Sequence, residues 1–354
     1  MADGAVMDIV SVPEAIEWQA RHAEQAGAPG TARIVRALLA LEGSPAATAR
    51  RIHGWQGLSL RDAMPLRIAG GIHNLLLVGE EPRLEDVYAG RIADQGQIDA
   101  LVREIVETYD ARLMPWLDGP PQTNEVGRSA SIMAGLLWLA DGRVASQFEL
   151  LEIGASAGIN TMMGRYRFDL GGTTTGPSAS RMRIEPEWRG DAPPATDVTI
   201  VDARGNDIAP VDLTDSDQAL RLKSYVWPEA SQRMGRIDTA ISMAERMPPE
   251  VERGDAGDWV CEQLDRPQAP GTTRVLFHSI MWQYLPDHTQ ERIAEAMARA
   301  AQASDEDRPL AWIALETNRE TFAHELRVRY WPGGDEAVHL ANAHPHGAWV
   351  EWLG

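Results

Sequence analysis

Cysteine is almost absent from this sequence, which carries one, Cys261, in 354 residues. A single cysteine excludes a disulfide within the chain and any cysteine-rich metal site. Positive charge is scarce as well, because 33 Lys and Arg face 52 Asp and Glu, for a formal net charge of −19. Nucleic-acid phosphates require a basic surface, and an anionic membrane repels an acidic one. We therefore expect neither nucleic acid nor a membrane as a partner.

Long apolar runs are missing too. The longest apolar stretch, from about Ile132 to Ala140, is too short to cross a bilayer. The first residues, Met1 to Ala5, do not lead from a basic segment into an apolar run and so do not resemble a signal peptide. The sequence thus predicts a cytoplasmic protein, with 44% apolar residues to fill a core.

Residues 1–145 are predicted to form a helical module. Apolar residues recur at helical spacing from Thr31 to Leu41, from Leu66 to Leu76 and from Ile98 to Trp116, and Ser129 to Leu139 completes the set. The pair Gly70-Gly71 falls inside one of these helices, which indicates a close contact or a break there. Strand-like alternation is not found in this part of the sequence.

Residues 146–354 follow a different pattern, in which strand-length apolar runs alternate with helices as in a parallel sheet. The strongest strand candidates are 148–153, 198–202, 274–279 and 310–316, and the tail from Glu325 to Trp352 has the pattern of an antiparallel hairpin. We therefore predict an α/β fold with a mostly parallel, methyltransferase-like Rossmann sheet of seven strands and a C-terminal antiparallel hairpin, preceded by the helical module.

One stretch, Phe148 to Asn160, combines a predicted buried strand, a turn of small residues and the expected first turn of a helix. Its centre, Glu152-Ile153-Gly154-Ala155-Ser156-Ala157-Gly158, resembles the first motif of S-adenosylmethionine-dependent methyltransferases, which usually has the form acidic-x-Gly-x-Gly-x-Gly. In such a turn small residues let a nucleoside approach the backbone, and a helix N-terminus faces the carboxylate of the ligand. The same residues also spell Gly-x-Ser-x-Gly, the nucleophile elbow of α/β-hydrolases.

The position of this motif in the chain favours the methyltransferase interpretation. A hydrolase elbow lies in the middle of a sheet, whereas here the preceding residues are predicted helical and the motif follows the first strand. Glu152 supplies the acidic position that a hydrolase does not require. The hydrolase alternative keeps Ser156 as nucleophile with a late histidine, His344 or His346, as its base. A nicotinamide dehydrogenase is a third possibility, because Gly-x-Gly-x-x-Gly also opens a Rossmann helix.

The whole chain resembles a bacterial family known as domain of unknown function 2332, whose core is similar to the methyltransferase fold. The motifs that carry the resemblance are Gln122 to Arg128, Glu152 to Gly158, Tyr166 to Asp169, Arg204 to Pro210, Val226 to Pro228, Gly254 to Ala256 and His346 to Trp349. The resemblance implies a fold and no established reaction. Ser156, in place of the middle glycine of the methyltransferase motif, departs from the common pattern.

Cofactor-binding candidates follow from the methyltransferase interpretation. Glu152 would lie beneath S-adenosylmethionine, with Gly154, Ser156 and Gly158 allowing its close approach. An acid is expected about 20 residues later to bind the ribose, and both Asp169 and Asp207 are candidates between which the sequence does not decide. The triplet Gly254-Asp255-Ala256 resembles the motif whose aspartate accepts from the adenine amino group, although an aspartate is equally suited to cap a helix. Arg128 could pair with the carboxylate of the cofactor.

His278, at the end of a predicted strand, is the candidate general base, because a neutral imidazole accepts a proton near physiological pH; a core histidine whose ring nitrogens are both bonded is the alternative. His344 and His346 lack partners at metal-ligand spacing, so no metal is expected. The resulting hypothesis is an S-adenosylmethionine-dependent methyltransferase for a small molecule. A serine hydrolase using Ser156 and a non-catalytic nucleoside-binding protein remain as alternatives. The acceptor, its reacting atom and the oligomeric state are left open.

Overall fold

The computed structural model describes residues 11–57 and 62–354, and the chain divides into two compact units. Unit 1 comprises Met1–Thr123 and Asp215–Asp238, and unit 2 comprises Asn124–Thr214 and Thr239–Gly354. The units are therefore interleaved along the chain. The sequence pattern predicted a single division, at residue 145.

Unit 1 is helical throughout its described part, as expected. Its helices are α2 (Val12–Gln25), α3 (Pro29–Ala37), η1 (Leu38–Leu41), α4 (Ala47–His53), α5 (Met64–Leu77), α6 (Arg83–Tyr88), α7 (Gln95–Thr108), α8 (Asp110–Leu113), η2 (Met114–Leu117), α10 (Ser216–Ser224) and the first part of α11 (Ser231–Arg246). The start of α2 shows how the sequence sets a boundary, because the Ser11 hydroxyl accepts from the Glu14 amide and a proline occupies the first turn.

The pair Gly70-Gly71 marks a close contact inside α5, and the helix continues through it. A Cβ added at Gly70 would lie 2.7 Å from the ring of Tyr225, and one at Gly71 would lie 2.8 Å from the ring of Trp116. The two rings themselves meet edge to face, with centroids 5.4 Å apart. Tyr225 follows α10, so this contact joins residues 215–238 to the N-terminal helices.

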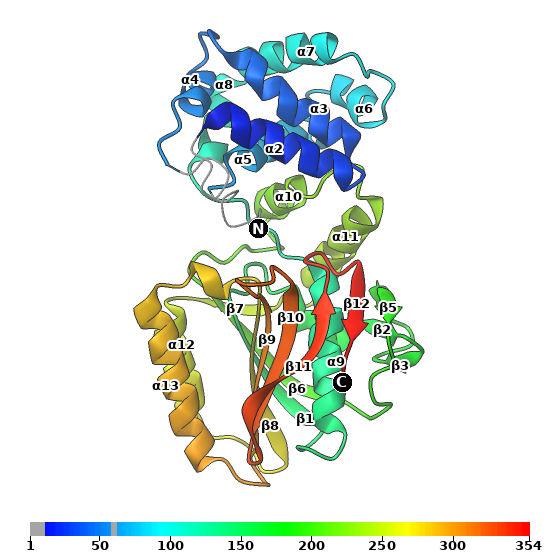
Figure 1. Ribbon diagram of the computed structural model, residues 1–354, viewed down its shortest axis with the longest axis vertical. Coiled ribbons are helices and arrows are strands. Elements are labelled where there is room, and N and C mark those ends of the chain that lie inside the picture. The colour runs from blue at the N-terminus through cyan, green and yellow to red at the C-terminus, as the bar shows by residue number, and fades with distance from the viewer. Residues whose placement is uncertain (1–10, 58–61) are drawn as a thin grey trace. The chain divides into compact units, whose positions relative to one another are not determined.

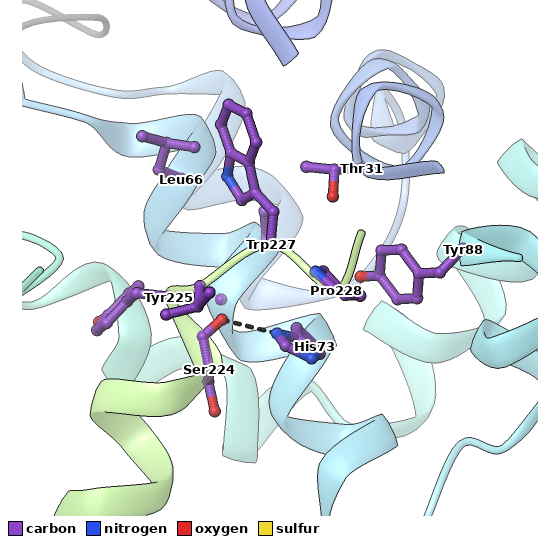
Figure 2. A pocket seen from close by; sticks show the side chains of 11 residues that line it. Thr31, Leu66, His73, Tyr88, Ser224, Tyr225, Trp227 and Pro228 are labelled. Carbon is purple, nitrogen blue, oxygen red and sulfur yellow. Dashed lines mark hydrogen bonds between the residues drawn. The ribbon is translucent and has the colours of Figure 1, made fainter. Parts of the chain in front are cut away.

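A small cavity of about 20 Å³ lies next to this contact (Figure 2). Its lining includes His73. Burial lowers the pKa of this imidazole to about 4, so the ring is neutral at physiological pH. The Nδ1 atom of His73 lies 3.0 Å from the Ser224 carbonyl oxygen and donates to it. A cavity of this size has room for one water molecule.

Unit 2 has an α/β fold built on a large, mostly parallel central sheet. Its strands are β1 (Gln147–Ile153), β2 (Arg167–Leu170), β3 (Thr173–Thr175), β4 (Arg183–Ile184), β5 (Glu187–Arg189), β6 (Thr199–Asp207), β7 (Glu250–Arg253), β8 (Thr272–Ser279), β9 (Leu310–Thr317), β10 (His324–Trp331), β11 (Gly334–Ala343) and β12 (Trp349–Trp352). Its helices are η3 (Val126–Arg128), α9 (Ser129–Ala140), η4 (Asn160–Arg165), the end of α11, α12 (Ala256–Asp265), η5 (Trp282–Tyr284) and α13 (Asp287–Ala303).

The central sheet has nine strands within the described residues, in the order β5-β12-β11-β10-β9-β8-β1-β6-β7. Strands β7, β6, β1, β8 and β9 are parallel neighbours. The predicted C-terminal hairpin is confirmed as β10 and β11, which extend the sheet as an antiparallel meander from β9. The expectation of seven strands missed the edge pair of β12 and β5. Strands β2, β3 and β4 form a separate small sheet.

Helices pack on both faces of the central sheet (Figure 1). Buried residues of α12 and α13, such as Val260 and Ile293, form one cluster with Leu276 of β8. Helix α9 packs on the other face, where a Cβ at Gly135 would lie 3.4 Å from the side chain of Ile313. Successive strand residues point to opposite faces, so the apolar runs of β8 and β9 are buried on both sides.

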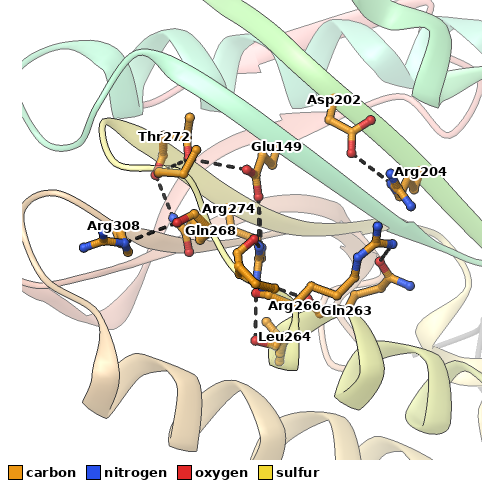
Figure 3. Close-up of polar contacts among 12 residues, drawn as sticks. Glu149, Asp202, Arg204, Gln263, Leu264, Arg266, Gln268, Thr272, Arg274 and Arg308 are labelled. Atoms are coloured by element: carbon orange, nitrogen blue, oxygen red, sulfur yellow. Dashed lines mark hydrogen bonds and ion pairs between the residues drawn. The ribbon is translucent and has the colours of Figure 1, made fainter.

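A buried arginine organises the edge of the sheet near the amino ends of β1 and β8 (Figure 3). The guanidinium of Arg274 in β8 pairs with Glu149 in β1, at 3.0 Å between Nη2 and Oε2. It also donates to backbone carbonyls where α12 ends, among them those of Gln263, Arg266 and Pro267. Carbonyls at a helix C-terminus lack partners within the helix, so Arg274 satisfies them.

Candidate functional site

The predicted motif lies at the topological switch point of the parallel strands. Read from β7, these strands come in chain order third, second, first, fourth and fifth, which is the order of a doubly wound sheet. The order reverses at β1, between β6 and β8. In open α/β sheets the crevice for ligands lies at the carboxyl ends of the strands at this point. The Gly154 to Gly158 turn follows the carboxyl end of β1 and therefore occupies that position.

Backbone geometry explains the small residues of the turn. Gly154 and Gly158 have φ of 66° and 69°, a region that disfavours residues with a Cβ. A Cβ at Gly154 would also meet the Met281 side chain at 2.8 Å, and one at Gly158 would meet Val251 at 2.6 Å. Ser156 adopts φ of 52° although it is not glycine, a strain that persists where surrounding contacts hold the backbone.

The α-helix predicted after this turn is not present, so that prediction was wrong. Residues 156–159 form turns, and Asn160–Arg165 form the short 3₁₀ helix η4. The predicted helix N-terminus for a ligand carboxylate is therefore missing. The turn is held instead by backbone bonds to the neighbouring strand, because the Ala155 amide donates to the Asn206 carbonyl at 3.0 Å.

Glu152 is buried in β1 just before the turn, with 1% of its surface exposed. Its Oε1 accepts from the Asn160 side-chain amide at 3.3 Å. Its Oε2 has no hydrogen-bond partner among the residues that the structure describes. Burial raises the pKa of this carboxyl to about 8, against the smaller opposing effects of Asn160 and Arg128. Glu152 is thus a carboxyl group that holds its proton at neutral pH.

Two further buried oxygens of the same turn lack partners within the described part of the chain. They are the Ser156 hydroxyl and the side-chain carbonyl of Asn160, and the two residues are 8% and 2% exposed. Native proteins rarely leave buried polar atoms unsatisfied, so these oxygens single out the turn as a place where a polar group could bind. Asn160 was not among the predicted site residues. A side-chain amide directly after a small-residue turn was the available signal.

The structure separates the two candidate ribose acids. Asp207 ends β6, next to β1, and its Oδ2 accepts from the Ser156 amide at 2.8 Å while its Oδ1 accepts from the Ala209 amide. Asp169 lies in β2 of the small sheet, is exposed, and accepts from the Gly172 amide of a turn. Asp207 therefore lies beside the candidate crevice, and Asp169 is in a solvent-exposed hairpin.

Asp255 and Ala256 follow the carboxyl end of β7, which neighbours β6. The Oδ1 atom of Asp255 accepts from the amides of Gly257 and Asp258 and so caps α12. The cap was one of the two roles expected for this residue. Its other oxygen, Oδ2, makes one long contact of 3.5 Å with the Thr289 hydroxyl. The Gly254 amide donates to the Asp207 carbonyl oxygen at 3.1 Å, which ties this segment to the end of β6.

Arg128 is 8% exposed and binds backbone carbonyls. It donates to the Pro345 carbonyl at 2.8 Å and to the Ser279 carbonyl at 3.1 Å. Its charge acts on Glu152 and lowers the pKa of that carboxyl, although less than burial raises it. Arg128 thus lies near Glu152, and its bonds to the end of β8 and to the turn at Pro345 give it a structural role there.

His278 is buried at the end of β8, and both of its ring nitrogens have partners. Nε2 accepts from the Trp312 indole at 3.0 Å, so Nδ1 carries the proton and lies 2.7 Å from Oε1 of Glu316. A histidine in this arrangement has no lone pair available, and the predicted general-base role would require the Trp312 bond to break. The Glu316 oxygen also accepts from the Met281 amide, so His278 positions the loop that packs against Gly154.

The late histidines of the hydrolase alternative do not bond to Ser156, whose hydroxyl lacks a partner in residues 11–57 and 62–354. The Nδ1 atom of His344 accepts from the His346 amide, and His346 lies 3.8 Å from Glu125. Another histidine, His324, was not considered from the sequence. Burial lowers the pKa of His324, and the nearby Arg128 and His344 act in the same direction.

Neither a metal-binding cluster nor a membrane-spanning helix occurs in the described residues. No group of three or more His, Cys, Asp or Glu side chains in these residues is arranged to hold a metal ion. Among the helices of the described segments, none combines the length and apolarity needed to cross a membrane.

Fold and site together define an α/β protein with a buried polar turn at the switch point of a doubly wound sheet. The chain belongs to the family described as an uncharacterized protein conserved in bacteria, domain of unknown function 2332, whose model matches residues 13–352. No curated protein and no solved structure matches the chain.

Proposed function

We propose that this protein is a cytoplasmic S-adenosylmethionine-dependent methyltransferase with a methyltransferase-like Rossmann core, acting on a small molecule. One observation carries the proposal. Three acids, Glu152, Asp207 and Asp255, lie at or just after the carboxyl ends of three adjacent parallel strands, β1, β6 and β7. This is the edge at which doubly wound sheets bind nucleotides.

The residues of the crevice fit such a cofactor on two counts. Gly154 and Gly158 give the turn the left-handed backbone that such a motif needs, and the buried oxygens of Glu152, Ser156 and Asn160 without partners in the described residues are polar groups that a ligand could bond. The Asp207 carboxylate accepts hydrogen bonds from two backbone amides and keeps further lone pairs that could accept from a ribose hydroxyl. Asp255, at the end of the next strand, would accept from the adenine amino group.

When bound, S-adenosylmethionine supplies a methyl group for in-line displacement at its sulfonium carbon. This reaction demands mainly that donor and acceptor be positioned. The chain contributes the rigid turn after β1 and the loop after β8, which His278 and Glu316 hold in place through the Met281 amide. Catalysis by positioning is consistent with a His278 that has no free nitrogen.

A thermal-shift panel tests the proposal. S-adenosylmethionine and S-adenosylhomocysteine at about 100 times their dissociation constants should stabilise the fold by about 2.7 kcal/mol, whereas NAD and ATP should not. Stabilisation by NAD alone would support a dehydrogenase. No shift with any of the four at millimolar concentration would reject the methyltransferase and the nucleoside-binding alternatives together.

A serine hydrolase is the second candidate, favoured by the backbone of Ser156. Its φ of 52° is the strained geometry expected of a nucleophile elbow. No base bonds to its hydroxyl among the described residues, which argues against activation. Stoichiometric labelling by a fluorophosphonate probe, lost in Ser156→Ala and retained in the matched control Ser180→Ala, would establish the hydrolase. Absence of labelling would remove it.

A further inference from the structure

The loop after β8 brings a side chain onto the turn after β1. A Cβ built on Gly154 would lie 2.8 Å from both Cγ and Cε of Met281 and 3.0 Å from its Cβ. The Met281 side chain thus fills the space into which a side chain at Gly154 would project. A glycine lets a ligand approach the backbone closely only where that space is empty. Met281 and a nucleoside therefore exclude one another on this face of Gly154.

Hydrogen bonds to β9 hold the Met281 backbone in this position. The Oε1 atom of Glu316 accepts from the Met281 amide at 3.1 Å and from the Trp282 amide at 3.2 Å. The preceding amide, that of Ile280, donates to the Leu315 carbonyl at 2.8 Å. Rotation of the Met281 side chain displaces Cγ and Cε, but Cβ moves only with the backbone. Full withdrawal of the side chain therefore requires these backbone bonds to change.

The backbone that these bonds hold is strained. Ile280 has φ of 51°, in the left-handed region, which a β-branched residue rarely adopts. Such strain persists only where the surroundings impose it. Release of the bonds to β9 would let Ile280 return to an ordinary conformation, and Met281 would move with it. A residue at the end of a strand that absorbs a large change in φ is a typical hinge.

The far end of the loop is anchored separately. The side-chain amide of Gln290 in α13 donates to the carbonyls of Trp282 and Leu285, both at 3.0 Å. The ring of Trp282 also stacks on that of His278, with centroids 4.9 Å apart. These contacts do not involve the two residues between the end of β8 and Trp282. The movement is therefore confined to those two residues.

We propose that Ile280 and Met281 form a gate on the cofactor site, which is closed when Met281 lies on Gly154 and is held closed by Glu316. The inference rests on the proposed function, because the gate acts on the ligand of that site. A protein whose binding-competent state is only a fraction of the population binds its ligand more weakly by that fraction. Changes that favour the open gate should therefore tighten binding, although none of them adds a contact to the ligand.

Calorimetry with S-adenosylhomocysteine on four variants tests the gate. Met281→Ala removes Cγ and Cε and should lower the dissociation constant about tenfold, as expected for an open state that holds about a tenth of the wild-type molecules. Met281→Leu keeps a side chain of similar volume and should match the wild type. Glu316→Ala removes the acceptor of both amides and should also tighten binding. Glu316→Gln retains an acceptor oxygen and should stay near the wild type.

Amide hydrogen exchange without added ligand tests the role of Glu316 independently of the cofactor. The amides of Met281 and Trp282 should exchange about tenfold faster in Glu316→Ala than in the wild type, because they lose a charged acceptor. They should remain slow in Glu316→Gln. Unchanged exchange in Glu316→Ala would show that this carboxylate does not hold the loop and would overturn its part in the gate.

The gate and the proposed function fail in different ways. Dissociation constants in Met281→Ala and Glu316→Ala that equal or exceed the wild-type value would overturn the gate and leave the cofactor assignment standing. Absence of binding by the wild type and by both variants would reject the proposed function and the gate with it. If Glu316→Ala fails to fold, the comparison of Met281→Ala with Met281→Leu decides the gate alone.

Discussion

Two glutamates three residues apart on β1 have opposite environments. Glu149, near the amino end of the strand, pairs with Arg274, whose guanidinium also binds the carbonyls that end α12. Glu152, at the carboxyl end, has one side-chain amide and a partnerless oxygen within the described residues. The strand is the same, but one carboxyl is satisfied by the protein and the other is not.

The difference separates what stabilises the fold from what the fold offers to a ligand. Breaking a fully engaged buried pair leaves an uncompensated charge, which is costly. A carboxyl without a partner already carries that cost in the folded state and avoids it by keeping its proton. We infer that Glu149, near the amino end of β1, stabilises the fold. Glu152, near the carboxyl end, lowers stability and leaves a polar group that a ligand could bind.

The largest expected change in stability comes from removing the ion pair between Arg274 and Glu149. Arg274→Met should lower the free energy of unfolding of unit 2 by about 3 kcal/mol, because it leaves Glu149 and several carbonyls without donors. The control is Arg204→Met, which removes the more exposed ion pair with Asp202 on the adjacent strand (Figure 3) and should cost less than about 1 kcal/mol. Urea denaturation measures both. Equal losses would show that Arg274 has no special role.

Glu152→Gln should raise the free energy of unfolding at pH 8.5, and the size of this effect should depend on pH. Between about pH 4.5 and pH 8 the unfolded chain has lost the Glu152 proton while the folded chain keeps it. The unfolded state then binds fewer protons, so the wild-type protein loses stability as the pH rises through this window. The glutamine variant should match or fall slightly below the wild type at pH 5 and exceed it by a few kcal/mol at pH 8.5. A constant difference between the two proteins across this range would mean that Glu152 does not titrate as described.

Asp255 should give the smallest change in stability. Asp255→Ala removes the N-cap of α12 and should cost about 1 kcal/mol. If the residue also accepts from adenine, as proposed, the same change should weaken S-adenosylhomocysteine binding by about 10- to 150-fold. Melting temperature and dissociation constant are measured on one variant. A lowered melting temperature with unchanged affinity would confine Asp255 to its capping role.

The fold was largely predictable because its periodicities are local. The apolar runs of β1, β8 and β9 and the helical spacing of α3 and α5 lie within single elements, and their positions were predicted to within a few residues. The prediction of a helix after Gly158 was wrong, because Asn206 and Asp207, about 50 residues away, hold the backbone of that turn. The glycine spacing alone does not show such a contact.

The site was predictable only in part, for the same reason. Motif spacing selected Glu152, Asp207 and Asp255, and the structure places them at neighbouring strand ends. The choice between Asp169 and Asp207 required knowing that β2, β3 and β4 form a small sheet of their own. The partners of His278 lie on β9, 34 and 38 residues further along the chain. No local pattern shows that both of its nitrogens are occupied.

The most direct test of the account is the dissociation constant of S-adenosylhomocysteine for the paired variants Asp207→Asn and Asp169→Asn. The first alters a carboxylate beside the turn after β1, and the second makes the same chemical change in the exposed hairpin. We expect that the wild type binds, that Asp207→Asn weakens binding at least about tenfold through loss of a charged acceptor, and that Asp169→Asn leaves it unchanged. No binding by the wild type, or equal constants for all three proteins, would contradict a cofactor site at this edge of the sheet.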